Sequence, residues 1–337
     1  MITLGIETSC DETSVGIVED GTTVLSNIVN SQIDAHKKYG GVVPEMASRL
    51  HVMNIVPVIE DAMTTASLKW RDIDLISSTM SPGLLGALSV GFNAAKTLSF
   101  CLGRPFIGVN HIEGHIYANL LNGGKYFEFP FIALVASGGH TQLILVEEEF
   151  KYKLVGNTLD DAIGEAFDKS ARIMGLGYPG GPIIDQLAKE GNKKRYRLPS
   201  VKTNRKMDFS FSGLKTAALR IVSENDLFNK ENDSQDIKDF CATLQEKLIG
   251  ELTKKLLLAA DTYNISNILI AGGVSANSLF REKIAGEEFK RFNVAIPQLK
   301  FCTDNGAMIA AAGYFRYKKG YSTELNAMPS ASNRLCS

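Results

Sequence analysis

The feature that most constrains the fold is a strand, polar turn, strand pattern that occurs twice in the chain. Residues 2–18 contain two short apolar runs, which are separated by the polar segment Glu7 to Glu12. Residues 131–146 repeat the pattern around a shorter turn, Ser137 to His140. Two apolar runs joined by a polar or glycine-bearing turn indicate a β-hairpin. We therefore expect an internal duplication with two domains, residues 1–125 and 126–337.

Helices and further strands are predicted after each hairpin, from apolar spacing and glycine turns. In the first half these are a helix over 44–63, a strand over 74–78, a glycine- and alanine-rich helix ending near Gly103, and a strand over 105–109. In the second half they are helices over 160–174 and 234–262, a strand over 267–271 and a final helix over 307–315. The helix over 44–63 should bury the face that carries Met46, Leu50, Met53, Val56 and Ile59.

Two such halves facing a central cleft are the architecture of the actin, Hsp70 and sugar-kinase ATPases. The expected fold class is therefore α/β, a duplicated actin-like fold with ribonuclease H-like halves. In those proteins the hairpin turns hold phosphates. Glu7 stands where the first hairpin of those folds usually carries an aspartate.

Composition and charge fit a globular protein of two domains. The chain has 337 residues, of which 45% are hydrophobic and 22% charged, with a net charge of −1. That charge argues against non-specific binding of nucleic acid over the whole surface, although a local basic patch is compatible with it. Its 5 cysteines are scattered without CxxC spacing, which favours a reducing compartment. No leader or long uncharged apolar run is evident, so we expect a cytoplasmic protein without a membrane segment.

Two histidines near the end of the first half are the strongest candidates for a metal site. If a helix begins at Asn110 as its N-cap, His111 and His115 are four residues apart on one helix face. Two imidazoles at this spacing suit a transition metal, although such a pair can equally be packed or solvated. Asp304, just before the last helix, is the candidate third ligand, and its alternative role is a helix cap.

Glu113 lies between these histidines but in the wrong place for a zinc protease. The zincin pattern places its glutamate directly after the first histidine. Glu113 is two residues after His111, about 200° around a helix from it, so it should face away from the metal. Glu113 is therefore poorly placed to act as the general base of a metalloprotease.

Two segments of the second half suggest binding of a phosphorylated ligand. Gly175 to Pro182 contains four glycines within seven residues, which would let backbone amides approach an anion or a ribose; a helix C-cap is the alternative. Asn192 to Lys206 carries seven cations and no acid, including Lys193, Lys194 and Arg195. Such a run is either a solvated loop or a contact to nucleic-acid phosphates.

Nine segments in this order resemble the bacterial TsaD family, the tRNA threonylcarbamoyladenosine synthase subunits once described as glycoproteases. They are Ile6 to Ser14, Gly40 to Glu45, Asn110 to His115, Ser137 to Gln142, Gly164 to Lys169, Gly175 to Asp185, Phe209 to Lys215, Gly272 to Asn277 and Thr303 to Met308. The chain departs from the family pattern at Leu50 and Phe280, and neither residue is a proposed ligand.

The resemblance implies an enzyme with one divalent metal ion per subunit, held by His111, His115 and Asp304. It implies iron, and a His-His-Asp set also suits zinc. The implied reaction transfers a threonylcarbamoyl group from threonylcarbamoyl-AMP to the exocyclic N6 amine of the adenosine 3′ of the anticodon. The tRNAs are those that read codons beginning with A. The residues at matching positions that would bind the donor are Val135, Ala136, Ser137, Gly138, Gly139, Asp168, Gly181, Asp185 and Asn277.

The implied partners are tRNA, a paralogue subunit of the same fold, a small ATPase subunit and a separate synthase that makes the adenylate. Because AMP is a good leaving group, the transfer needs placement and charge stabilisation rather than a protein nucleophile. Asp11 and Glu12 remain candidates to accept the amine proton. Three other readings stay open: a metalloprotease, an actin-like ATPase or kinase, and a non-catalytic scaffold of a tRNA modification complex.

Overall fold

The computed structural model describes residues 1–125, 128–200, 203–332 and 335. The chain divides into two compact units: unit 1 comprises Met1–Tyr126 and Pro297–Ser337, and unit 2 comprises Phe127–Ile296. The expected division placed residues 297–337 in the second half. They belong to unit 1 instead, because the last helix packs on the sheet of the first half.

Unit 1 is built on a mixed sheet of five strands. They are β1 (Ile2–Glu7), β2 (Glu12–Glu19), β3 (Thr23–Ser31), β4 (Leu75–Ser81) and β5 (Phe106–Asn110), in the order β3-β2-β1-β4-β5. The first three pair antiparallel, whereas β4 is parallel to both β1 and β5. The hairpin predicted from residues 2–18 is therefore the β1–β2 pair.

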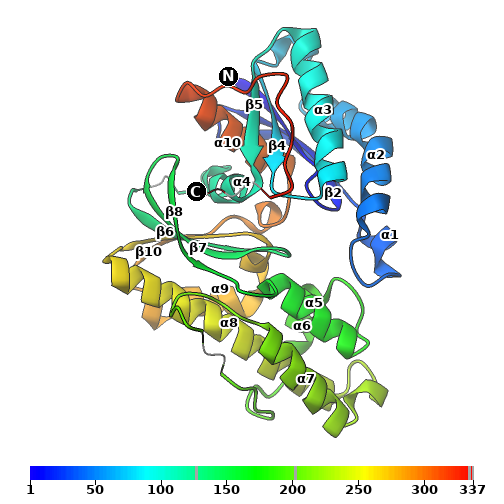
Figure 1. Cartoon of the computed structure of the whole chain (residues 1–337), viewed down its shortest axis with the longest axis vertical. Helices are drawn as coiled ribbons and strands as arrows, with labels where there is room; N and C mark the ends of the chain where they lie inside the picture. Colours follow the sequence, from blue (N-terminus) through cyan, green and yellow to red (C-terminus); the bar gives the residue numbers. More distant parts are fainter. Residues whose placement is uncertain (126–127, 201–202, 333–334, 336–337) are drawn as a thin grey trace. The chain divides into compact units, whose positions relative to one another are not determined.

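Helices cover both faces of this sheet (Figure 1). They are α1 (Ile33–Lys37), α2 (Pro44–Thr65), α3 (Leu85–Leu102), α4 (His111–Tyr117) and α10 (Gly306–Lys318). Ile6 of β1 packs in one core cluster with Phe92 of α3. Its neighbour Gly5 faces α10, since adjacent strand residues point to opposite faces.

Glycines on β1 and β2 let α10 approach the sheet at backbone distance. A Cβ at Gly5 would lie 2.3 Å from the amide nitrogen of Ala310, and one at Gly16 would lie 2.1 Å from that of Ala307. Any side chain there would force the helix away. This contact fixes the start of α10, and with it the preceding Asp304, beside the β1–β2 hairpin.

The buried face predicted for α2 is wrong. Met53 and Val56 are 70% and 58% exposed, whereas Ala47, Ile55 and Ala62 are buried together with Ile59. The helix carries apolar residues on more than one face, so periodicity alone does not select one. Contacts with β2, β3 and α3 make the choice.

Unit 2 repeats the strand arrangement of unit 1. Its strands are β6 (Phe131–Ala136), β7 (Thr141–Glu148), β8 (Lys151–Asn157), β9 (Asn267–Ala271) and β10 (Asn293–Ala295), in the order β10-β9-β6-β7-β8. Strands β6, β7 and β8 pair antiparallel, and β9 is parallel to β6 and β10. Because the strands match one for one in order and direction, the predicted duplication is confirmed.

The described residues of unit 2 form the helices α5 (Ile163–Ile173), α6 (Gly180–Ala188), α7 (Ser212–Glu224), α8 (Gln235–Tyr263) and α9 (Ser278–Ala285). Short 3₁₀ turns in the two units lie at Trp70–Asp72, Ala118–Leu120, Leu227–Asn229, Gly273–Ala276, Glu287–Phe289 and Leu299–Phe301. The core of unit 2 joins β6 and β9 to α8 through residues such as Leu134, Ile270 and Leu248. Of the glycine cluster, Gly175 and Gly177 form the turn, with φ of 72° and 103°, while Gly180 and Gly181 open α6.

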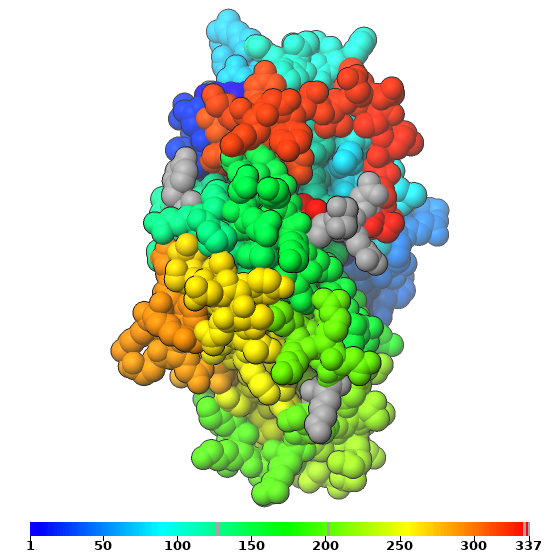
Figure 2. All heavy atoms as spheres, turned by 60° about the vertical axis from the view of Figure 1, so that its left-hand side comes forward, coloured from blue at the N-terminus to red at the C-terminus, as the bar shows by residue number. Residues whose placement is uncertain are grey.

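After α10 the chain returns over the surface of unit 1, coloured orange to red in Figure 2. Ser330 donates its backbone N–H to the carbonyl of Met80, and Lys96 of α3 donates to the carbonyl of Ala327. In the described part of the chain, α3 is the one helix long and apolar enough to cross a membrane. One face of this helix, with Phe92 and Ala95, is fully buried in the core of unit 1, while Leu85 and Phe100 are exposed.

Candidate metal centre and nucleotide-binding residues

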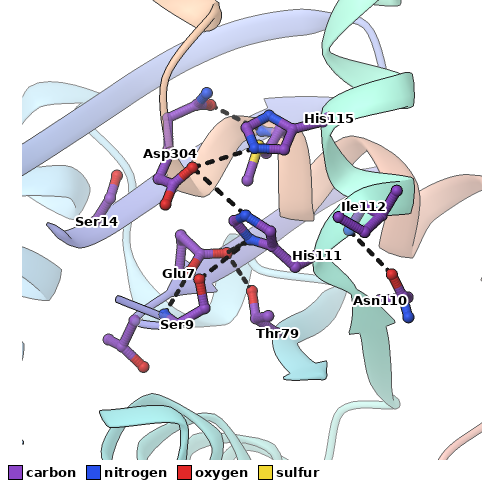
Figure 3. Close-up of polar contacts among 12 residues, drawn as sticks. Glu7, Ser9, Ser14, Thr79, Asn110, His111, Ile112, His115 and Asp304 are labelled. Atoms are coloured by element: carbon purple, nitrogen blue, oxygen red, sulfur yellow. Dashed lines mark hydrogen bonds and ion pairs between the residues drawn. The ribbon is translucent and has the colours of Figure 1, made fainter. Parts of the chain in front are cut away.

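The histidine helix begins where the sequence predicts. Asn110 is the N-cap of α4, and its side-chain oxygen accepts a hydrogen bond of 2.9 Å from the amide of Ile112. His111 and His115 therefore lie one turn apart on the same face, with ring centroids separated by 4.7 Å. Both rings are buried and point to the same side of α4 (Figure 3).

Asp304 meets both histidines at this position. It precedes α10, whose N-cap is Asn305 rather than Asp304. Asp304 Oδ1 lies 3.5 Å from His111 Nε2 and 3.2 Å from His115 Nε2. One ligand atom from each of the three residues falls within 4.8 Å of the others. The predicted ligand set is thus brought together within unit 1.

The chemistry of these atoms fits a metal ion. In the part of the chain that the structure describes, neither ring nitrogen of fully buried His115 has a hydrogen-bond partner. Its Nε2 is near Asp304 Oδ1, but that contact lacks hydrogen-bond geometry. Leaving such a group unpaired costs about 1–3 kcal/mol, which a coordinated metal would remove. Nitrogen and oxygen ligands bind such metals at about 2.0–2.2 Å, so adjacent ligand atoms should be about 3.0–3.6 Å apart. The two distances from Asp304 Oδ1 to the histidine Nε2 atoms fall in this range.

Behind His111, on the side opposite Asp304, lies the buried carboxylate of Glu7. Glu7 Oε2 is 3.2 Å from His111 Nδ1 and accepts a short hydrogen bond from the hydroxyl of Thr79. Glu7 Oε1 accepts from the amide of Ser9 at 2.5 Å. Glu7, Ser9 and Thr79 were not predicted from the sequence to belong to the metal site. The available signal was that polar residues follow apolar runs at the ends of both β1 and β4.

The acids around His111 change its protonation. Burial lowers the pKa of His111, but the carboxylates of Asp304 and Glu7 outweigh this effect and raise it to about 9. Burial likewise raises the pKa of Glu7, and the charge of His111 outweighs this effect and lowers it. Without a metal, His111 is therefore a cation at neutral pH, and a metal must displace its proton.

Glu113 faces away from the ligands, as the sequence predicts. It is fully buried and forms a bidentate ion pair with Arg316 of α10. Arg316 Nη2 lies 2.8 Å from Glu113 Oε2, and Arg316 Nε donates to Glu113 Oε1. The pair ties α4 to α10, the two helices that flank the ligands. No protease-type base is supplied by this residue.

Of the candidate proton acceptors, Asp11 lies in the β1–β2 turn and Glu12 is the first residue of β2. Asp11 is buried, and Glu12 accepts a hydrogen bond of 3.3 Å from the hydroxyl of Ser31. Burial raises the pKa of Glu12, and the neighbouring Asp11 and Asp304 carboxylates raise it further. Glu12 therefore holds a proton more readily than an ordinary glutamate.

In unit 2, the predicted donor-binding turn closes the β6–β7 hairpin. The amide of Ser137 donates to the carbonyl of His140 at 2.8 Å. Among the described residues, no atom lies within 4 Å of a Cβ built on Gly138 or Gly139. A Cβ on Gly164, by contrast, would lie 2.7 Å from Gly138 Cα, so α5 supports the turn from the other side. The two glycines of the turn thus present open backbone.

The other residues predicted to bind the threonylcarbamoyl donor lie at or near the starts of α6 and α9 in unit 2. Asp168 accepts from the amide of Gly180 at 2.8 Å, and Gly181 is open in the same way as the turn glycines. Asp185 accepts from the amide and hydroxyl of Ser278, the latter at 2.7 Å. Asn277 caps α9 by accepting from Phe280 and donates to Gln245 at 3.1 Å.

The end of β9 meets the end of β6, which carries Val135 and Ala136. A Cβ on Gly272 would lie 2.4 Å from the carbonyl oxygen of Ala136. Because β6 and β9 are parallel, the Ser137 turn and the loop to Asn277 lie at the same edge of the sheet. Ligands of open α/β sheets bind at this kind of edge.

Some cations of the basic run, Asn192 to Lys206, have acidic partners outside this run. Lys193 pairs with Glu246 at 3.1 Å, and Glu246 also pairs with Lys283 of α9. Lys194 and Arg195 are exposed. Arg205 lies 3.5 Å from Asp208, while Lys202 falls outside the described residues.

A family model and two related proteins match this chain over most of its length, and all carry the same name. A model of the TsaD family, described as tRNA N6-adenosine threonylcarbamoyltransferase, matches residues 23–311. The protein of that name from Dictyoglomus turgidum is 52% identical over 326 residues, covering 96% of both chains. The one from Thermosipho africanus is 50% identical over 333 residues, covering 98% of this chain and 99% of its own.

Solved structures show the same fold at much lower identity. HypF, in a phosphate- and nucleotide-bound form, has a TM-score of 0.56 at 12% identity, over 94% of this chain and 46% of its own. Component A of (R)-2-hydroxyglutaryl-CoA dehydratase from Acidaminococcus fermentans has a TM-score of 0.52 at 14% identity, covering 95% and 98%. These likenesses bear on the fold alone, and the expected actin-like ATPase fold is confirmed.

Proposed function

The chain belongs to the TsaD family of tRNA N6-adenosine threonylcarbamoyltransferases, and we propose that His111, His115 and Asp304 hold the metal ion of this transferase. The observation that carries the proposal is the buried His115 ring, which lacks a hydrogen-bond partner within the described residues and lies 3.2 Å from Asp304. Iron is the metal implied by the family resemblance, and zinc suits the same donor atoms. A metal bound there would act as a Lewis acid toward oxygens of the donor.

The proposed donor is threonylcarbamoyl-AMP, and the proposed acceptor is the N6 amine of the adenosine 3′ of the anticodon, in tRNAs that read codons beginning with A. The amine nitrogen forms a bond to the carbamoyl carbon. The bond from that carbon to the phosphate oxygen breaks, AMP leaves with the electron pair, and the amine proton passes to a base. Since AMP leaves readily, the protein mainly positions the reactants and stabilises charge.

The donor would be held by residues of unit 2. Open amides of Ser137, Gly138 and Gly139 suit its phosphate, and the start of α6 at Gly181 offers further amides. Asp185 has carboxylate lone pairs beyond its bonds to Ser278, and these suit ribose hydroxyls. Val135, Ala136, Asp168 and Asn277 complete the proposed donor site.

Partners and location rest on the family resemblance. We propose a paralogue subunit of the same fold, a small ATPase subunit and a separate synthase supplying the adenylate. The proposed compartment is the cytoplasm, where both tRNA and a reducing environment are found. Lys193, Lys194 and Arg195 are the proposed tRNA contacts.

A single-turnover experiment tests the proposal. Purified protein, with its partners where needed, is mixed with threonylcarbamoyl-AMP and unmodified tRNA, and the modified nucleoside is measured by mass spectrometry. We expect transfer by the wild type and none by His115→Ala. A phosphorylated product from ATP without transfer would instead support a kinase. Full activity of the His111, His115 and Asp304 variants in the complete complex would support a scaffold.

A further inference from the structure

We infer that Glu7 is a positioning residue for the metal site, whose carboxylate holds His111 so that its Nε2 faces Asp304 and His115. The inference rests on the proposed metal-binding role of these three residues. Figure 3 shows the order of contacts: Glu7 on the Nδ1 side of His111, and Asp304 on the Nε2 side. Because the ring is planar, fixing one nitrogen fixes the direction of the other.

The orientation of Glu7 is itself fixed by its neighbours. Its two oxygens accept from the hydroxyl of Thr79 and from the amide of Ser9. Glu7 ends β1, Thr79 is on β4, and His111 directly follows β5, and these three strands are adjacent in one sheet. The support of Oε2 therefore comes from the neighbouring strand β4, and that of Oε1 from Ser9 in the β1–β2 turn.

This arrangement is the one that a metal-binding imidazole requires. A histidine that coordinates through Nε2 carries its proton on Nδ1, and a carboxylate acceptor there fixes the tautomer and strengthens the ligand. His111 has such an acceptor at 3.2 Å. For His115, no described residue accepts from Nδ1, so only its place on α4 orients it. His111 is thus the anchored ligand of the pair.

Two alternatives for Glu7 fit the contacts less well. As a general base, or as a ligand for a nucleotide-bound cation, it would need an oxygen that faces substrate. Glu7 is fully buried and both of its oxygens accept hydrogen bonds within the protein. The hydroxyl of Ser9 also lies 3.1 Å from His111 Nδ1 and can accept in its place. Loss of the carboxylate should therefore weaken the site rather than abolish it.

Cobalt(II) titration of the metal-free, full-length protein tests the inference. We expect Glu7→Gln to lower cobalt affinity by about 10- to 100-fold, the usual effect of losing such a supporting carboxylate, and to shift the d–d absorption bands. Glu113→Gln is the matched control, since Glu113 is equally buried and close in sequence to His111 but pairs with Arg316. It should lower the thermal stability and leave cobalt affinity and spectrum unchanged.

The possible results separate this inference from the proposed metal site. If His115→Ala binds cobalt as the wild type does, the metal site itself is wrong. If His115→Ala loses cobalt but Glu7→Gln titrates like the wild type with the same spectrum, the metal site stands and the role of Glu7 is overturned. If circular dichroism shows that Glu7→Gln does not fold, Thr79→Val decides. This substitution removes only the hydroxyl that donates to Glu7 Oε2. Unchanged cobalt affinity in Thr79→Val would overturn the inference.

Discussion

At the scale of single residues, the metal site is asymmetric. His111 is surrounded by carboxylates, with Glu7 on one nitrogen and Asp304 near the other. His115 is buried without a hydrogen-bond partner in the described part of the chain. The two imidazoles should therefore respond differently when the metal is absent: one holds a proton, and the other carries the cost of an unpaired buried group.

Replacing His115 with Ala should release the metal and leave the fold near native. The substitution removes a ligand, and it breaks no hydrogen bond within the described residues, so only packing is lost. Elemental analysis of purified protein measures the metal, and circular dichroism reports the fold. Stoichiometric metal in a folded His115→Ala protein would contradict the assignment of this ligand.

The stability of the metal-free protein should depend on His111 above neutral pH. The neighbouring carboxylates raise its pKa from 6.5 to about 9 against the effect of burial. A raised pKa means that the folded state binds the proton more tightly, so the stabilisation is fully present below 6.5. It is lost as the pH rises through about 9.

Urea unfolding of the metal-free protein across this pH range measures the effect. The free energy of unfolding should fall between about pH 6.5 and 9 in the wild type. It should fall less in His111→Ala, which lacks the titrating group. Equal slopes in the two proteins would show that another group is responsible.

At the scale of elements, each candidate site depends on how a helix meets a sheet or a turn. In unit 1, Gly5 and Gly16 let the backbone of α10 touch β1 and β2. In unit 2, Gly164 brings the start of α5 against the Ser137 turn. Positions where a helix backbone touches a strand or turn accept only glycine, whereas Gly138 and Gly139 are open.

Replacing Gly138 with Val should weaken donor binding without unfolding the protein. No described atom lies within 4 Å of a Cβ at this position, so the new side chain would meet the ligand rather than the protein. Calorimetric titration with the donor, or with AMP, measures the affinity, and metal content should not change. Gly164→Val is the contrasting variant, because its Cβ would lie 2.7 Å from Gly138 Cα, and it should lose stability. Unaltered donor affinity in Gly138→Val would remove this turn from the site.

At the scale of the whole molecule, the net charge of −1 gives no general attraction for tRNA. Binding would then depend on local cations such as Lys193, Lys194 and Arg195. Lys193 already pairs with Glu246, so its contribution should be smaller than that of its two exposed neighbours.

Replacing Lys193, Lys194 and Arg195 together with Ala should weaken tRNA binding and flatten its salt dependence. Each lost phosphate contact lowers the slope of log affinity against log salt by about 0.7–0.9, so a change of about two is expected. Affinity measured over a salt series gives the slope. The double variant Lys290→Ala, Arg291→Ala removes surface cations from another segment and serves as the control. A slope equal to that of the wild type would make the run a solvated loop.

Local structure follows from the sequence alone: both hairpins, the start of α4 at Asn110, and the placing of His111 and His115 on one face. These features follow from short-range rules, namely strand alternation, capping and helical spacing. The sequence also indicated that Glu113 points away from the two histidines, because a helix fixes the angle between nearby residues. The family resemblance supplied the ligand and donor residues, which local patterns suggest only in part.

Which distant segments meet depends on how the elements pack in three dimensions. This packing brought Asp304 to the two histidines, placed Glu7 behind His111 and paired Glu113 with Arg316. It also moved residues 297–337 into unit 1 and selected the buried face of α2. The physical reason is that these outcomes depend on packing between elements far apart in the chain. Periodicity shows that a helix such as α2 carries apolar residues, but the elements that it packs against select which face is buried.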